Sequence, residues 1–154
     1  MTIQTSRFGP LDMDADRILE FPHGLYGFED RHRFCLLQHD QQSCFRWLQC
    51  IDDPSLAMVV VDLLAFFPDY DLEIGRQTAR LLEAQSENEL ELLALVTVNR
   101  DTEQICANLL GPVVINPRRR KGLQMIADGE RYHTRHEIGA PRRQTRAPDI
   151  AAAV

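Results

Sequence analysis

The chain has 154 residues, of which 44% are apolar and 26% are charged, a composition typical of one globular domain with its own core. Its formal net charge of −6 is unevenly distributed. Residues 1–116 carry 8 basic and 19 acidic side chains, a net charge of −11, whereas residues 117–154 carry 9 basic and 4 acidic side chains, a net charge of +5. Phosphate repels such an acidic body, which excludes broad nucleic-acid binding by residues 1–116 and leaves it open only for the basic end.

The sequence indicates a cytoplasmic protein without a membrane partner. Residues 1–7 lack the apolar segment of a signal peptide, and the longest apolar run, residues 56–61, is far shorter than the roughly 18 residues that a membrane helix needs. The cysteines show no C-x-x-C spacing, which favours buried reduced thiols over a disulfide or a metal site. They are Cys35, Cys44, Cys50 and Cys106.

The first predicted elements are a hairpin and a shaped loop. Residues 3–7 and 11–13 predict two strands around a Gly-Pro turn. Residues 21–28 contain a proline, which fixes φ, together with Gly24 and Gly27, which permit positive φ. This stretch therefore predicts a loop of defined shape rather than a flexible one.

Six further segments have the apolar or alternating pattern of short strands: 33–38, 45–51, 56–61, 92–98, 112–115 and 123–126. The continuous runs at 56–61 and 92–98 are typical of strands buried on both faces. Residues 78–84 predict one short peripheral helix, because they are good helix formers without Gly or Pro. These elements predict an all-β fold, a small barrel or sandwich of many short antiparallel strands.

The domain is expected to span residues 1–138. Residues 139–154 are polar and basic, contain prolines and show no periodicity, which predicts a disordered basic tail.

The sequence predicts a protein without catalytic activity, cofactor or metal. It contains no nucleophile–base arrangement, P-loop or glycine-rich dinucleotide motif. The many loop carboxylates, among them Asp52 and Asp53, are typical of a solvated acidic surface. His133 and His136 have a spacing that could bind a metal, but two ligands are too few for a structural zinc site.

Aromatic side chains crowd residues 63–70, where Phe66, Phe67 and Tyr70 lie close to a proline and to acidic residues such as Asp69. Two interpretations stay open. The aromatic side chains cover an open end of the barrel, or they form an apolar patch with an acidic rim that binds a protein partner.

Five segments, in this order, resemble the FliW family of bacterial flagellar assembly factors. They are Phe21-Pro-His-Gly-Leu-Tyr-Gly-Phe-Glu29, Phe45-Arg-Trp-Leu-Gln-Cys-Ile-Asp-Asp-Pro54, Phe67-Pro-Asp-Tyr70, Ala107-Asn-Leu-Leu-Gly-Pro-Val-Val-Ile-Asn116 and Tyr132-His-Thr-Arg-His136. The resemblance covers residues 3–137 and implies a small barrel-like all-β domain that is not an enzyme.

The resemblance also implies two cytoplasmic protein partners. One is flagellin, bound before export in a chaperone-like way. The other is the carbon storage regulator CsrA, an RNA-binding translational repressor whose capture relieves repression of the flagellin message, so that flagellin and CsrA compete for this protein.

The expected partner-binding residues are Phe66, Phe67, Asp69, Tyr70, Asp52 and Asp53. The aromatic side chains are expected to receive apolar side chains of a flagellin helix. The acidic body, to which Asp52 and Asp53 belong, is expected to attract a repressor that must be positively charged to bind RNA.

Two alternatives remain for the basic residues. A cyclic-dinucleotide sensor of the PilZ type is suggested by Arg142 and Arg146, which have the R-x-x-x-R form. The accompanying D/N-x-S-x-x-G motif is incomplete, because Met58 stands where glycine is required. Direct RNA binding is suggested by the basic turn at 118–121 together with the tail arginines, but only Tyr132 is interleaved to stack on a base, so no direct nucleic-acid partner is expected.

Overall fold

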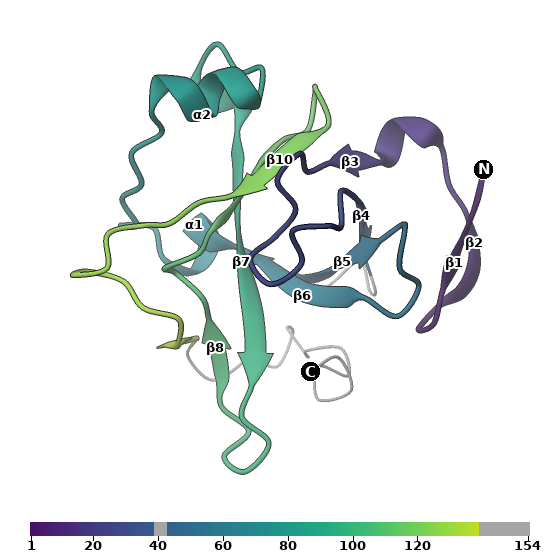
Figure 1. Ribbon diagram of the computed structural model, residues 1–154. Helices are drawn as coiled ribbons and strands as arrows, with labels where there is room; N and C mark the ends of the chain where they lie inside the picture. The colour runs from purple at the N-terminus through teal and green to yellow at the C-terminus, as the bar shows by residue number, and fades with distance from the viewer. Residues whose placement is uncertain (39–42, 139–154) are drawn as a thin grey trace.

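The computed structural model describes residues 1–38 and 43–138, so the predicted tail, residues 139–154, lies outside the described residues. The chain begins with a separate two-stranded hairpin of β1 (Thr2–Thr5) and β2 (Gly9–Asp12), which lies at one side of the molecule (Figure 1). This pairing, in which Ile3 lies opposite Leu11, confirms that a hairpin opens the chain. Its predicted turn is wrong, because Gly9 and Pro10 belong to β2 and the turn is formed by residues 6–8.

Seven strands of the described chain form a closed ring. They are β3 (Leu19–Glu20), β4 (Arg33–Gln38), β5 (Phe45–Cys50), β6 (Ala57–Asp62), β7 (Glu91–Val98), β9 (Val113–Asn116) and β10 (Lys121–Gln124). The order around the ring is β7-β6-β5-β4-β3-β10-β9, and the ring closes because β9 pairs with β7 as well as with β10. The predicted small barrel is therefore confirmed, with one exception to its antiparallel pairing: β3 and β10 run parallel.

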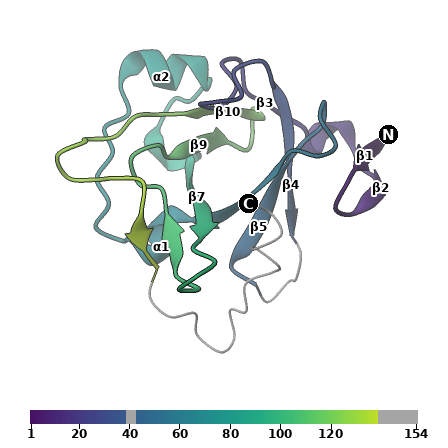
Figure 2. The same ribbon diagram turned by 60° about the horizontal axis from the view of Figure 1, so that its bottom comes forward.

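The longest strand, β7, pairs with three other strands along its two edges. One edge pairs with β6 over residues 93–96. The opposite edge pairs first with β9, over residues 91–93, and then with β8 (Ile105–Ala107), over residues 96–98. A short strand, β11 (His136–Glu137), pairs with β8 and extends the sheet beyond the ring (Figure 2).

Three of the ring strands, β5, β6 and β7, pack apolar side chains on both faces. The inner face forms one apolar cluster, to which β3, β4, β5, β6, β7 and β9 contribute Leu19, Phe34, Leu48, Val60, Leu93 and Ile115. The outer face of β5, β6 and β7 belongs to a second cluster, with Phe45, Trp47, Val59, Val61, Ala94 and Val96. Alternate residues of β6 thus enter different clusters, as expected for a continuous apolar run.

Two short α-helices accompany the barrel, where the sequence predicted one. The helix expected at 78–84 begins slightly earlier, as α2 (Arg76–Leu81). The other, α1 (Leu63–Phe66), follows β6 directly and was not predicted, because one helical turn is too short to show a period. Two 3-10 helices, Ala15–Arg17 and Glu87–Glu89, complete the described helices, and none of the helices found there has the length and apolarity to cross a bilayer.

All four cysteines are free. Cys35 and Cys50 are buried, as predicted, whereas Cys44 and Cys106 are half-buried. Burial raises the pKa of the Cys35 thiol to about 11, which keeps this thiol neutral at physiological pH.

Candidate functional site

The aromatic residues that follow β6 are ordered by two consecutive turns. In α1 the chain reverses, and the backbone N–H of Phe67 donates to the carbonyl of Leu63 at 2.9 Å. The backbone N–H of Tyr70 then donates to the carbonyl of Phe67 at 3.0 Å. As a result, Phe66 and Phe67 are half-buried and pack against the outer apolar cluster, while Tyr70 belongs to that cluster.

These residues form one wall of a surface groove of about 440 Å³, which we call the aromatic groove. Its lining residues are Phe66, Phe67, Pro68, Asp69, Tyr70, Leu109, Arg131, Tyr132 and His136. The opposite wall therefore comes from the segment that leads into β11, more than 60 residues further along the chain.

Tyr70 joins the two walls. Its ring lies 4.4 Å from the ring of Tyr132, measured between centroids, and its hydroxyl donates to the carbonyl of Leu109 at 2.7 Å. Tyr70 is only 9% exposed, and burial raises the pKa of its hydroxyl. The Tyr132 hydroxyl in turn accepts a hydrogen bond from the backbone N–H of Asp71 at 2.8 Å.

The rim of the groove carries both signs of charge. Asp69 is exposed, as predicted. Arg131 forms an ion pair with Asp71 at 3.2 Å, and its guanidinium carbon lies 5.2 Å from the centre of the Tyr132 ring. The rim thus carries Arg131 in addition to the acidic residues that the sequence suggested.

Two histidines lie at one end of the groove. The rings of His133 and His136 are stacked at 3.8 Å, and the rings of His136 and Phe67 are nearly perpendicular, with centroids 6.1 Å apart. Burial, and to a smaller extent His133, lower the pKa of His136. Nowhere in residues 1–38 and 43–138 do three or more potential ligands cluster to hold a metal ion.

Asp52 and Asp53 lie in the turn between β5 and β6, whereas the aromatic groove begins at the other end of β6. A strand of six residues separates these ends by about 20 Å. The Asp52 carboxylate accepts a hydrogen bond from Nε of Arg33 at 3.1 Å. The Asp53 carboxylate accepts from the N–H and hydroxyl of Ser55, which chiefly lowers its pKa, and from Arg31.

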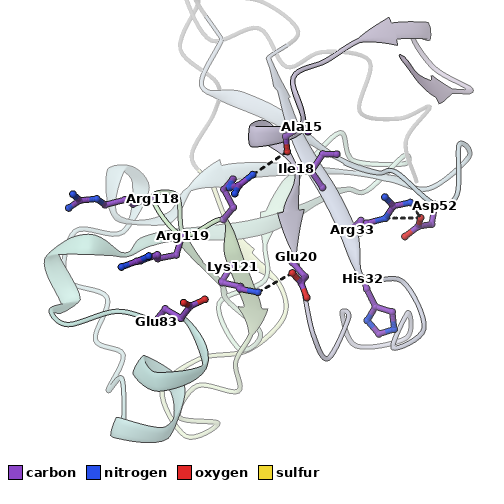
Figure 3. A pocket seen from close by; sticks show the side chains of 11 residues that line it. Ala15, Ile18, Glu20, His32, Arg33, Asp52, Glu83, Arg118, Arg119 and Lys121 are labelled. Atoms are coloured by element: carbon purple, nitrogen blue, oxygen red, sulfur yellow. Dashed lines mark hydrogen bonds and ion pairs between the residues drawn. The ribbon is translucent and has the colours of Figure 1, made fainter. Parts of the chain in front are cut away.

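Asp52 also lines a second cavity, of about 790 Å³, which we call the basic cleft (Figure 3). Its lining residues are Ala15, Ile18, Glu20, His32, Arg33, Asp52, Glu83, Arg118, Arg119, Arg120 and Lys121. The basic turn noted in the sequence therefore lines a cavity beside the pairing of β3 with β10 rather than projecting alone into solvent.

The structure brings together four of the six predicted residues: Phe66, Phe67, Asp69 and Tyr70. It places Asp52 and Asp53 elsewhere. Sequence reasoning did not identify Leu109, Arg131, Tyr132 and His136 as neighbours of the aromatic residues. The signal for two of them was present, since Tyr132 and His136 are the ends of one of the five segments that resemble the FliW family.

Comparison with known proteins gives a consistent result. The family model described as FliW protein matches residues 2–138, which include both cavities. The flagellar assembly factor FliW of Treponema pallidum is 37% identical over 149 residues, covering 97% of this chain and 99% of the relative. That of Syntrophomonas wolfei is 37% identical over 153 residues, covering 99% and 98%. A crystal structure of the flagellar assembly factor FliW has a TM-score of 0.81 at 30% identity, covering 90% of this chain and 96% of that one.

Proposed function

The chain belongs to the FliW family of flagellar assembly factors, and we propose that within this family it acts by binding two proteins in the cytoplasm. It holds flagellin before export, in a chaperone-like way. It also binds the translational repressor CsrA, which relieves repression of the flagellin message. The two partners compete, so that flagellin synthesis follows flagellin export.

The aromatic groove carries the proposal for flagellin. Phe66 and Phe67 are half-exposed on one side of a 440 Å³ groove, where a partner's side chains could cover them. A groove lined by aromatic side chains suits the apolar side chains that a helix presents at a spacing of three or four residues. Aromatic residues in such grooves also dominate binding energies.

Long-range charge carries the proposal for CsrA. A repressor that binds RNA presents positive charge, and residues 1–116 have a net charge of −11. Asp52 and Asp53 already face Arg33 and Arg31 of the same chain. We therefore assign the attraction to the acidic body as a whole, of which these two carboxylates are a small part.

Replacing Phe67 by alanine tests the flagellin surface. Phe67→Ala removes an aromatic side chain from the wall of the groove and is expected to weaken flagellin binding at least tenfold, or by about 1.4 kcal/mol. Tyr70→Ala is unsuitable, because Tyr70 is buried and bonded to Leu109 and its loss would disturb the fold. Calorimetry with purified flagellin measures the effect.

Ile126→Ala is the matched control, because Ile126 is 59% exposed and lies outside the groove. This variant is expected to bind flagellin like the parent protein. Equal affinities of the parent, Phe67→Ala and Ile126→Ala proteins, all folded, would show that flagellin binds somewhere else.

A further inference from the structure

The basic turn between β9 and β10 is held rigidly from both sides. Arg120 has φ of +56°, a left-handed conformation that is uncommon for residues other than glycine. Its carbonyl accepts from the backbone N–H of Glu20 at 2.9 Å, and its Nη1 donates to the carbonyl of Ala15 at 3.3 Å. On the other side of the turn, the buried Asn116 donates from Nδ2 to the carbonyl of Leu82 at 2.8 Å.

The charges of the basic cleft do not balance. Five cationic side chains face three carboxylates, and two of those carboxylates are already paired, Glu20 with Lys121 and Asp52 with Arg33. Among the described residues Arg118 and Arg119 form no ion pair, and both extend from the turn in the same direction (Figure 3).

Two acidic side chains lie near these arginines and have to be considered. Glu83 lines the cleft without an ion pair in the described chain. Glu89, outside the lining, is held by the backbone N–H groups of Ser86 and Gln85, which lower its pKa more than Arg118 and Arg119 do. The cleft therefore keeps a net charge of +2 on a body that is otherwise strongly acidic.

The chemistry of the lining defines the ligand. A cavity of 790 Å³ has the size of a small-molecule site. Only Ala15 and Ile18 supply aliphatic side chains, and no Phe, Tyr or Trp lines the cleft, so it offers little to an apolar ring. Guanidinium groups bind phosphate oxygens in pairs, and a fixed turn reduces the entropy that binding would cost.

The geometry points to an anion site in the basic cleft that takes a small ligand carrying two or more phosphate groups, bound chiefly by Arg118 and Arg119. Lys121 and Arg33 also line the cleft and supply further positive charge from within their ion pairs. This site is separate from the aromatic groove, and its test needs no protein partner.

Calorimetric titration of the full chain with tripolyphosphate tests the assignment. Saturable one-to-one binding is expected, and Arg118→Ala/Arg119→Ala should weaken it at least tenfold. Glu83→Gln removes the unpaired carboxylate and should tighten binding severalfold. Arg76→Ala/Arg80→Ala is the matched control, since it removes the same charge from exposed positions of α2 outside the cleft and should leave the affinity unchanged.

Three results would overturn the site: no saturable binding, an equal loss in the two double variants, or no response to Glu83→Gln. ATP should bind within about tenfold of tripolyphosphate, because no Phe, Tyr or Trp lines the cleft to stack on a base. A much stronger preference for ATP would contradict recognition through phosphate groups. Circular dichroism and thermal melting of each variant separate loss of the site from loss of the fold.

Discussion

His136 is held in its neutral form by its surroundings. Its Nε2 accepts a hydrogen bond from the backbone N–H of His133 at 2.9 Å, which requires an unprotonated nitrogen. Its ring stacks on His133 and faces Phe67 and Tyr132, so a positive charge there would be poorly solvated and close to a second imidazole. Burial of the ring, and to a smaller extent the neighbouring His133, lower the pKa of His136 below its ordinary value.

A lowered pKa makes stability depend on pH in a defined direction. Below about pH 6.5 the unfolded chain takes up a proton at His136 before the folded chain does, so the free energy of unfolding should fall as the pH is lowered through this range. It should level off once the pH is below the folded pKa. Urea unfolding at pH 7.5, 6.5 and 5.5 measures the slope, and His136→Gln should make it shallower. An identical slope in the variant would mean that His136 does not titrate differently on folding.

Single residues of the candidate site were only partly predictable from the sequence. The cluster of Phe66, Phe67 and Tyr70 was visible because these residues are neighbours in the chain. The sequence did not reveal that Tyr70 is buried, since its burial depends on Leu109 and Tyr132, which reach it only through the fold. Asp52 and Asp53 were included among the expected partner-binding residues because of their charge alone. Charge does not show where in the fold a residue lies.

Among the elements, the loop over residues 21–28 has the strictest requirement for glycine. Gly24 has φ of +64°, and a Cβ atom added there would lie 2.4 Å from the carbonyl oxygen of Phe28. Gly9, in the first hairpin, has a similar φ of +69°, but a Cβ atom there would have no neighbour within 4 Å. The two glycines thus have the same left-handed backbone conformation, but only Gly9 has room for a Cβ atom.

This difference predicts unequal costs for one substitution. Gly9→Ala should lower the free energy of unfolding by about 1 kcal/mol, the cost of a left-handed conformation. Gly24→Ala should lower it by about 3 kcal/mol or more, because the backbone of the loop must also move. Equilibrium urea denaturation of both variants provides the measurement. Equal losses of unfolding free energy in the two variants would show that the loop backbone moves at no cost to make room for the added methyl group.

The strands were the most predictable elements. Residues 33–38 form β4 as expected, and β5, β6 and β7 differ from their predicted ranges by a residue or so. In contrast, β10 begins two residues before its predicted range, and the short strands β3, β8 and β11 were not predicted. The helices were less predictable. Neither α1 nor α2 has a side chain that caps its first turn, so little in the sequence marks where each begins.

At the scale of the whole molecule, closure of the barrel could not be derived from local patterns. It depends on β7 pairing with β9 and on the parallel contact between Glu20 and Lys121, which are a hundred residues apart. The resemblance to a family implied the barrel, whereas strand patterns alone left a sandwich open. The basic cleft is a product of this closure, since it lies where β3 meets β10.

The charge of the whole body predicts how CsrA binding responds to salt. If long-range attraction accelerates encounter, the association rate should fall at least about tenfold between 50 and 300 mM NaCl. Flagellin binding through the aromatic groove should change less, because apolar contacts are not screened. Surface plasmon resonance with each partner gives both rates. A CsrA association rate that is independent of salt would contradict electrostatic attraction.

The pairing of β3 with β10 also sets an order of events during synthesis. The first ring strand is made early, but its second neighbour exists only once residue 124 has been made, so the ring stays open while most of the chain is translated. The aromatic groove is completed later still, because two of its lining residues, Tyr132 and His136, are translated after β10. A nascent chain consequently has neither the closed barrel nor the complete aromatic groove, so the proposed capture of a partner has to wait until nearly all of the barrel has been translated.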